Sequence, residues 1–387
     1  MIEIGSKMFM DKEMREMSFE IRNADVSVVN AIRRTVLTDI ETLVMRGFPY
    51  NENNIEISKN TTKFNNEYLK HRLSCIPICN SDQSSFDNYV KNYVIELDET
   101  NDGVEKRYIT TEHLKVKNVN TGEYFDEKMV RESFFPADST TGEFILICIL
   151  YPSYNKKEDK ESLKFVSRIS KGKAKDNSCW NVVHNCTHEF IQDEEKVNAI
   201  VASANMTKYD EKDFRLLDAQ RIVHQNEYKM TIQTLDIYNS VQVLHIACNY
   251  IIDRLRTVIQ ICEQKPKILS KEATEYNATN GMLSEEELNS IAESYAVFFT
   301  YDGFIVLEIM DDDYTIGKLL EKHLYHQYGS GLLEYVGFKK EHPTTPEAFI
   351  YMKFSDKRNE VQVHDMISAT CTSIINSFNK IKENIKE

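Results

Sequence analysis

Two long stretches of this chain repeat apolar residues every three or four positions over about five helical turns. The repeating positions are Leu244, Ala247, Ile251, Leu255, Val258 and Cys262 in the first stretch, and Ile367, Cys371, Ile374, Phe378, Ile381 and Ile385 in the second. This spacing is typical of an amphipathic helix whose apolar seam must be buried along its whole length. The pattern predicts two helices whose seams pack against each other. The alternative is that each helix covers only its own sheet.

The same order of elements precedes each long helix. In the first half the predicted elements are a strand at Met17–Ile21, a helix from about Asp25 to Ile40 and a strand at Tyr228–Ile232. In the second half they are a strand at Gly303–Met310, a helix at Ile316–Leu324 and a strand at Phe349–Phe354. Gly329, Gly331, Gly337 and Pro343 predict a turn-rich connection before the last strand. Two similar modules in one chain indicate a pseudo-dimer.

A long insertion interrupts the first module. Strand character recurs within it at Tyr93–Leu97, Tyr108–Thr110, Leu114–Val119 and Phe144–Tyr151. The predicted domains are residues 1–47 with 201–262 (first module), 48–200 (β-rich insert), 263–284 (linker) and 285–387 (second module). Ser284 and Glu287 have the spacing of a capping box at the start of the second module. The expected fold class is α+β, with a sheet and a long amphipathic helix in each module.

The charge balance limits the classes of partner. The chain has 47 basic and 61 acidic side chains and a net charge of −14, which argues against a protein that grips nucleic acid over most of its surface. A helix that crosses a membrane needs about 18 consecutive apolar residues, and every apolar run in this sequence is much shorter. Eight scattered cysteines without an export signal predict reduced thiols in a cytoplasm-like compartment. The basic segment 156–175 is expected to be a solvated loop and strand edge or, alternatively, a contact with nucleic acid or an acidic partner.

Two clusters contain residue types that bind metals. Asp311–Asp313 groups three carboxylates, but it lies directly before a predicted helix, where acidic residues cap free N–H groups. We therefore expect a helix cap there. Cys179, His184, Cys186 and His188 are candidate zinc ligands, but their spacing does not match the usual pairs, and we expect unliganded side chains. The sequence has no phosphate-binding loop and no nucleophile elbow, so we predict no cofactor and no catalytic residue.

Several segments together resemble a known family. Asn23–Val36 contains Asn-Ala-Ile-Arg-Arg, and His71–Ile78 reads HRLSCIPI. With the strand Phe144–Leu150 and the segment Gly172–Trp180 (GKAKDNSCW), they resemble the RNA polymerase alpha-subunit family, which includes the third-largest subunit of eukaryotic RNA polymerase II, the archaeal D subunit and the bacterial alpha N-terminal domain. Asp313–Leu320 (DYTIGKLL) and Val336–Pro343 (VGFKKEHP) resemble its small partner, the eleventh subunit in eukaryotes and the L subunit in archaea.

The resemblance implies a fusion of the two alpha-like subunits, as in large cytoplasmic DNA viruses. The chain would then be a non-catalytic assembly subunit that binds the two large polymerase subunits and other subunits, with little or no DNA contact and no membrane. The expected large-subunit contacts are Asn30, Arg33, Arg34, His71, Arg72, Thr315, Gly317 and Lys318. Its expected location is the host cytoplasm, the viral factory and the virion. Eukaryotic relatives often carry a four-cysteine zinc loop after the HRL segment, but residues 80–98 contain no cysteine, so we expect no zinc there.

Two other functions stay open on the sequence. One is a metal-dependent hydrolase that uses Asp311–Asp313 or the cluster from Cys179 to His188. The other is an interaction pseudo-dimer that has no part in transcription.

Overall fold

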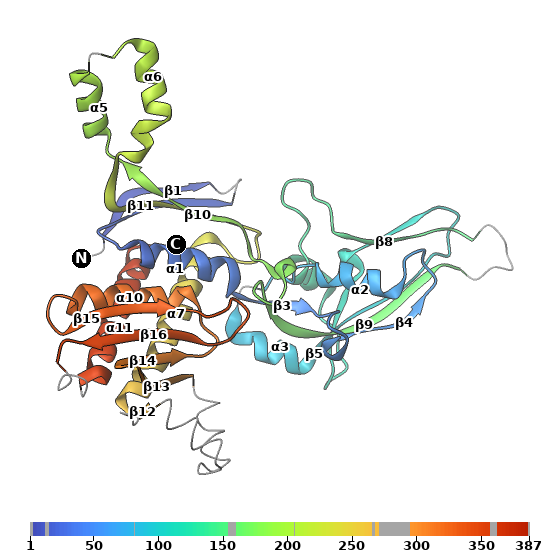
Figure 1. Cartoon of the computed structure of the whole chain (residues 1–387). Coiled ribbons are helices and arrows are strands. Elements are labelled where there is room, and N and C mark those ends of the chain that lie inside the picture. The colour runs from blue at the N-terminus through green and yellow to red at the C-terminus, as the bar shows by residue number, and fades with distance from the viewer. Residues whose placement is uncertain are drawn as a thin grey trace. The chain divides into compact units, whose positions relative to one another are not determined.

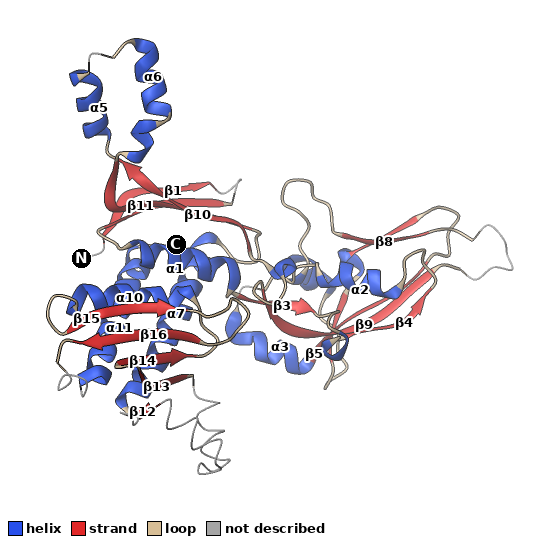
Figure 2. Cartoon of the chain, viewed as in Figure 1, coloured by secondary structure: helices blue, strands red, loops and turns tan. Residues whose placement is uncertain are grey.

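The computed structural model of the chain describes residues 3–11, 15–80, 82–153, 160–204, 206–264, 268–270, 295–356 and 362–385 (Figure 1). Contacts divide the chain into two compact units. The first comprises Met1–Val36, Cys186–Ile232 and Leu244–Glu387, and the second comprises Leu37–Asn185 and Gln233–Val243. Helices and mainly antiparallel sheets are mixed in both (Figure 2), which confirms the α+β class. The predicted capping box at Ser284 and Glu287 and most of the predicted linker lie outside the described residues.

The first sheet of the first unit has the strand order β1-β2-β11-β10. Its strands are β1 (Glu3–Asp11), β2 (Glu16–Arg22), β10 (Val183–Gln192) and β11 (Val223–Thr234). Met17, Phe19 and Ile21 on β2 have no exposed surface, which confirms the strand predicted from their alternation. A helical pair, α5 (Glu194–Ser203) and α6 (Lys208–Leu216), followed by the short turn η6 (Asp218–Arg221), joins β10 to β11. The end of the predicted β-rich insertion is therefore helical.

Helix α1 (Val26–Thr38) follows β2, as predicted. Asp25 precedes it, and its Oδ1 accepts the backbone N–H of Ser27 at 2.9 Å, the usual bond of a helix N-cap. The predicted apolar face is buried at Val29, Ile32 and Val36. The two ends of that face differ from the prediction: Val26 is 42% exposed, and Ile40 is buried but lies beyond the last helical residue.

A second sheet in the same unit has the order β12-β13-β14-β16-β15. Its strands are β12 (Leu269–Ser270), β13 (Ala296–Tyr301), β14 (Phe304–Ile309), β15 (Leu333–Lys339) and β16 (Ala348–Phe354). The predicted strands at Gly303–Met310 and Phe349–Phe354 are confirmed. The predicted turn-rich connection is wrong in part, because β15 runs through Gly337, which lies beneath the ring of Tyr335. A glycine inside a strand is typical of such a close approach.

Three helices complete this unit. They are α7 (Ser240–Glu263), which begins in the second unit, α10 (Tyr314–Tyr328) and α11 (Val363–Asn384), and α10 contacts β15, β16 and α11. The Nε2 of His245 on α7 donates a hydrogen bond to the Ile385 carbonyl at 2.8 Å, and Lys382 Nζ donates to Asn249 Oδ1. No helix in the described part of the chain is long and apolar enough to span a membrane.

The second unit is built mostly from strands. The larger sheet has the order β3-β9-β5-β7, with β4 also paired to β9, and β6 pairs with β8. The strands are β3 (Glu41–Met45), β4 (Ile55–Asn60), β5 (Tyr93–Thr100), β6 (Arg107–Thr110), β7 (Lys115–Asn118), β8 (Leu146–Leu150) and β9 (Ser162–Lys173). The helical segments are α2 (Asn66–Ser74), α3 (Phe86–Asn92), α4 (Glu127–Met129) and the short turns η1 (Tyr50–Glu52), η2 (Gln83–Ser85), η3 (Thr111–His113), η4 (Val130–Phe134) and η5 (Ser178–Trp180). The four predicted insert strands are confirmed.

The basic segment that ends at Lys175 differs from its prediction. Most of it is β9, which pairs on one side with β3 and β4 and on the other with β5, so it is a central strand and not a strand edge. Leu163, Phe165 and Ile169 are buried. Its lysines point outward to carboxylates, as in the pair between Lys171 and Asp87. The buried residues Leu163, Phe165 and Ile169 occupy alternate positions between charged residues, and burial of this face makes β9 a central strand.

Candidate functional site

The paired arginines of α1 have different surroundings. The Nε and Nη2 atoms of Arg33 donate to Asn30 Oδ1 at 3.0 and 2.9 Å, one turn earlier on the same helix. This i,i+3 pair holds both side chains along the partly exposed side of α1. Arg33 and Asn30 are therefore pre-arranged at the surface and can accept a further partner.

The guanidinium of Arg34 is bonded to side chains of the same chain. Its Nε donates to Thr315 Oγ1 at 3.0 Å, and its Nη2 forms an ion pair with Asp313 at the start of α10. Asp313 Oδ1 in turn accepts both the backbone N–H and the hydroxyl of Thr315, each at 2.9 Å. Burial works to raise the pKa of Asp313, but the bonds from Thr315 and the charge of Arg34 outweigh it and hold that pKa below its usual value. These three side chains link α1 to the N-terminus of α10.

The neighbouring carboxylate, Asp312, belongs to a buried network. Its Oδ2 accepts the Tyr295 hydroxyl at 2.7 Å, and its Oδ1 accepts the Asp313 N–H at 3.0 Å. The guanidinium of Arg254 on α7 lies 5.0 Å from the centroid of the Tyr295 ring. Burial raises the pKa of Asp312 to about 6, although the Tyr295 hydroxyl and Arg254 act in the opposite direction.

The three aspartates 311–313 do not form a metal site. Asp313 is the N-cap of α10, which confirms the capping prediction, and Asp312 is bonded to Tyr295. Throughout the described ranges, no group of three or more histidine, cysteine, aspartate or glutamate side chains could hold a metal ion. The metal-dependent hydrolase therefore has no support in the part of the chain that the structure describes.

The candidate zinc ligands Cys179, His184, Cys186 and His188 form no metal-binding group within the described residues either. Cys179 contacts Cys75, and its Sγ lies 3.7 Å from the Ser74 carbonyl oxygen. Burial, together with Cys75, raises the pKa of Cys179 to about 11. Burial raises the pKa of Cys186 to about 12, which disfavours the thiolate that zinc needs. His184 is exposed, and burial followed by the charge of Arg33 lowers the pKa of His188.

A groove of about 460 Å³ runs between the first turn of α1 and helix α10. Its lining comprises Asp25, Val26, Ser27, Asn30, His188, Lys318, Glu321, Lys322, Tyr325 and Val336. Val26 and Tyr325 expose 42% and 58% of their surfaces. Ser27 Oγ and His188 Nδ1 are buried without a hydrogen-bond partner within the described chain. Unsatisfied polar atoms beside exposed apolar side chains are typical of a surface that a partner completes.

Two of the expected contacts are not at the surface. Thr315 is only 7% exposed and is bonded to Arg34 and Asp313. Gly317 is buried beneath Phe338, and a Cβ there would lie 2.0 Å from the ring. Contact of these two residues with the large subunits stays a prediction, and neither residue is exposed in the free chain. Lys318, one position further, is exposed and pairs with Glu321 at the rim of the groove.

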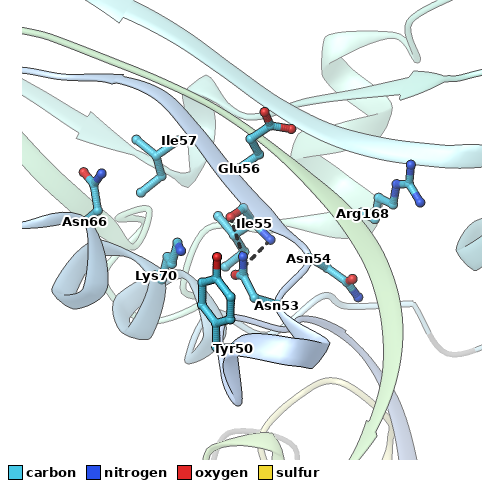
Figure 3. Close-up of a pocket in the computed structure, with 9 residues that line it drawn as sticks. All are labelled: Tyr50, Asn53, Asn54, Ile55, Glu56, Ile57, Asn66, Lys70 and Arg168. Carbon is cyan, nitrogen blue, oxygen red and sulfur yellow. Dashed lines mark hydrogen bonds between the residues drawn. The ribbon is translucent and has the colours of Figure 1, made fainter.

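In the second unit, His71 and Arg72 lie on α2. Arg72 donates to the carbonyls of Ile147 and Leu146 at 3.0 and 2.7 Å, so its guanidinium holds β8, while His71 is exposed. A hollow of about 560 Å³ adjoins this helix (Figure 3). Tyr50 at its mouth is 87% exposed, and Asn53 bonds the backbone of Ile55 in both directions. The lining of this hollow is mostly polar.

The residues expected to form the seam are all buried: Leu244, Ile251, Leu255, Val258, Ile367, Cys371, Ile374, Phe378 and Ile381. Cys371 is close enough to Cys262 for the two thiols to interact, although burial is the main cause of the raised pKa of Cys371. With the bonds of His245 to Ile385 and of Lys382 to Asn249, this indicates that α7 and α11 run antiparallel.

Sequence reasoning missed Tyr295, Arg254 and Ser27, and it considered His188 only as a candidate zinc ligand. Tyr295 and Arg254 lie 41 positions apart, and only the fold brings them together. Ser27 carries no local pattern that distinguishes it from other polar residues.

Comparison with known proteins identifies relatives of this fold. A model described as the RNA polymerase Rpb3/Rpb11 dimerisation domain matches residues 18–255. A conjugation stage-specific protein of Tetrahymena thermophila is 35% identical over 74 residues, which is 19% of this chain and 21% of that protein. Subunit 3 of DNA-directed RNA polymerases II, IV and V of Arabidopsis thaliana is 35% identical over 60 residues, 16% of this chain and 17% of that protein. The match thus spans about a fifth of the length of each relative.

Proposed function

We propose, because this chain belongs to the RNA polymerase Rpb3/Rpb11 dimerisation-domain family, that it is a non-catalytic assembly subunit of a multisubunit DNA-directed RNA polymerase. The match over residues 18–255 is the observation that carries this proposal. The similarity to subunit 3 of the Arabidopsis polymerases supports it. In this role the chain performs no chemistry and supplies a surface on which the two large subunits assemble.

We also propose that the chain is a fusion of two alpha-like modules that pair within one molecule. The supporting observation is the repeated element order: β2, α1, β11 and α7 in the first module, and β14, α10, β16 and α11 in the second. The proposed domains remain residues 1–47 with 201–262, the insert 48–200, the linker 263–284 and the second module 285–387. Fusion makes the pairing intramolecular, so it no longer depends on subunit concentration.

The proposed contact surface for the large subunits is the groove between α1 and α10. Arg33 bonds Asn30 of the groove lining and has no ion pair within the described residues, and such a guanidinium fork suits carboxylates and backbone carbonyls. Val26 offers an exposed apolar contact. Lys318 lies at the rim, and His71 on α2 is a further candidate contact.

A viral origin is the last part of this proposal. It rests on the fusion itself, which is a feature of large cytoplasmic DNA viruses, and on the reduced state expected for the cysteines. In that setting the chain would serve viral transcription in the host cytoplasm and be packaged in the virion.

Affinity purification of the tagged full chain tests the assembly role. Two very large polymerase-like chains should co-purify, and their absence would refute the proposal. Val26→Asp with Arg33→Glu should reduce their recovery by about tenfold or more, because the changes remove an apolar and a charged contact. Aspartate is favourable in the first turn of a helix, so Val26→Asp should not unfold α1.

A matched control keeps this test specific. Lys208 is an exposed lysine at the start of α6, far in sequence from the groove, and Lys208→Glu changes the charge as Arg33→Glu does. Recovery with Lys208→Glu should equal that of the unchanged chain. Equal losses in both variants would mean that overall charge, and not the groove, governs the association.

A further inference from the structure

A second cavity of the first unit lies beside the groove and differs from it in charge. It measures about 640 Å³ and is enclosed by the start of α1, by Asn226 on β11, and by helices α10 and α11. Its basic lining residues are Lys322, His323 and His326 from α10 and Lys380 from α11. Such a concentration of basic groups is unusual on a chain whose net charge is −14. A volume of this size is within the range of small-molecule sites.

The two lysines are available to a ligand. Neither Lys322 nor Lys380 forms an ion pair within the described parts of the chain; Lys322 is exposed and Lys380 is half-buried. Asp25 is the one carboxylate in the cavity lining, and its Oδ1 already accepts the Ser27 N–H as the cap of α1. Two free ammonium groups against one engaged carboxylate give the cavity a positive potential.

The other groups around the cavity also favour an anion. The N-terminal end of α1 borders it through Asn23, Ala24 and Asp25, and this end carries the positive pole of the helix dipole. Ser373, Asn376 and Ser377 of α11 supply hydroxyl and amide donors. The Nδ1 atom of His323 bonds the Leu319 carbonyl at 2.8 Å, which leaves its Nε2 available to the cavity.

We propose that this cavity binds a phosphoryl group, held by Lys322 and Lys380 with His323 and His326 beside them. Ammonium groups and helix N-termini are the usual ligands of phosphate oxygens. The ring of Tyr325, 58% exposed at the edge of the cavity, can stack on a base if the phosphoryl group belongs to a nucleotide. Free phosphate, pyrophosphate and a nucleotide share this chemistry. The cavity shares Asp25, Lys322 and Tyr325 with the groove, but binding of a phosphoryl group by the free chain does not depend on the polymerase role proposed above.

The affinity should increase as the pH falls. Burial is the main cause that lowers the pKa of His323, with the charge of Asp25 opposing it and that of His326 adding to it. A bound anion favours the protonated imidazole, and Lys322, Lys380, His326 and Asp25 are the other charged or titratable groups that face it. Protonation of His323 then adds a donor at Nε2, so the affinity for a given ionic form of the ligand should increase as the pH falls.

Calorimetric titration of the full chain with phosphate, pyrophosphate and ATP in separate experiments tests the proposal. Saturable binding of at least one of them, with Kd below about 1 mM, is expected. Tighter binding of ATP than of pyrophosphate would indicate a nucleotide, and the reverse would indicate a free phosphate compound. Adenosine without phosphate should not bind. No binding of any phosphate compound, or adenosine binding as tightly as ATP, would overturn the proposal.

Variants locate the binding. Lys322→Gln with Lys380→Gln should weaken it by about tenfold or more, and Lys322→Arg with Lys380→Arg should retain it. Lys208→Gln with Lys212→Gln, on the exposed helix α6, removes the same charge elsewhere and should have no effect. Unchanged affinity in the cavity variant, with its thermal midpoint intact, would contradict the assignment. Equal weakening by the α6 pair would contradict it as well, because it would indicate non-specific attraction.

Discussion

At the scale of single residues, three consecutive aspartates have three different environments. Asp313 caps α10 and pairs with Arg34, Asp312 is buried against Tyr295, and Asp311 is exposed in a turn with a positive φ of 55°. Residues of one type, adjacent in the sequence, thus have pKa values shifted in opposite directions. Burial acts to raise the pKa of both carboxyl groups. At Asp313 a cation and two hydrogen-bond donors outweigh the effect of burial, whereas at Asp312 burial dominates.

The raised pKa of Asp312 predicts a pH dependence of stability. In the folded chain Asp312 keeps its proton up to about pH 6, whereas the unfolded side chain loses it near 3.8. The folded state therefore binds more protons between these values, so this residue makes the free energy of unfolding fall as the pH rises through that window. At about 1.4 kcal/mol per pKa unit, the fall is about 3 kcal/mol.

Asp312→Asn should remove this part of the pH dependence. The free energy of unfolding, measured with urea between pH 4 and 7, should rise in the variant relative to the unchanged chain as the pH rises. This difference should level off above about pH 6, where Asp312 has lost its proton in both the folded and the unfolded state. Asp253→Asn is the control, because that carboxylate is 69% exposed. Parallel curves for Asp312→Asn and the unchanged chain would show that Asp312 ionises normally in the fold.

At the scale of elements, helix α10 is positioned by a close approach at one residue. Gly317 lies beneath Phe338 of β15, and a Cβ there would come within 2.0 Å of the ring. Gly317→Ala should destabilise the chain by about 1–3 kcal/mol, because the overpacking cost exceeds the gain in helix propensity of up to about 1 kcal/mol. Thermal or urea unfolding measures the difference.

Gly331 provides the control for this change. No atom lies within 4 Å of the position of its Cβ, so Gly331→Ala should not reduce the free energy of unfolding through packing. If Gly317→Ala is as stable as Gly331→Ala, α10 and β15 are not held at the separation that the structure gives them.

The sequence predicts those elements whose pattern is local. Alternation identifies β2 and β14, and the three-four spacing identifies α7 and α11, because burial of one face imposes both patterns. It misses β15, where glycine in a strand resembles a turn, and β9, where lysines surround the buried residues. It also misses the bond of Arg34 to Thr315, since nothing local connects positions 281 apart. Such contacts depend on packing between elements, which spacing alone does not specify.

At the scale of the whole molecule, a chain of net charge −14 can serve a nucleic-acid enzyme if it contacts only protein. The acidic balance excludes a broad DNA-binding surface but agrees with a subunit placed away from the template. Individual arginines have different roles. Arg34 links α1 to α10, Arg72 bonds backbone carbonyls of β8, and Arg33 lies at the surface of α1. The proposed role therefore depends on where a few cations lie and not on the sum of charges.

If α7 and α11 pack against each other, side chains on their two apolar faces should be energetically coupled. Cys262 and Cys371 are neighbours, and Leu255 and Phe378 lie about two turns from them in the directions that an antiparallel pair requires. Both side chains are fully buried. Leu255→Ala should cost about 2–5 kcal/mol and Phe378→Ala about 3–5 kcal/mol. If the two side chains share one seam, the double variant should deviate from the sum by about 0.5–3 kcal/mol.

A second pair of changes supplies the reference for this cycle. Leu163 is fully buried on β9 of the second unit, so Leu255→Ala and Leu163→Ala should add within about 0.5 kcal/mol. Urea unfolding of the single and double variants gives both coupling energies. A coupling between Leu255 and Phe378 no larger than that of the reference pair would mean that each long helix covers only its own sheet. A clear excess would support a seam that both modules share, because only side chains in contact lose the same packing.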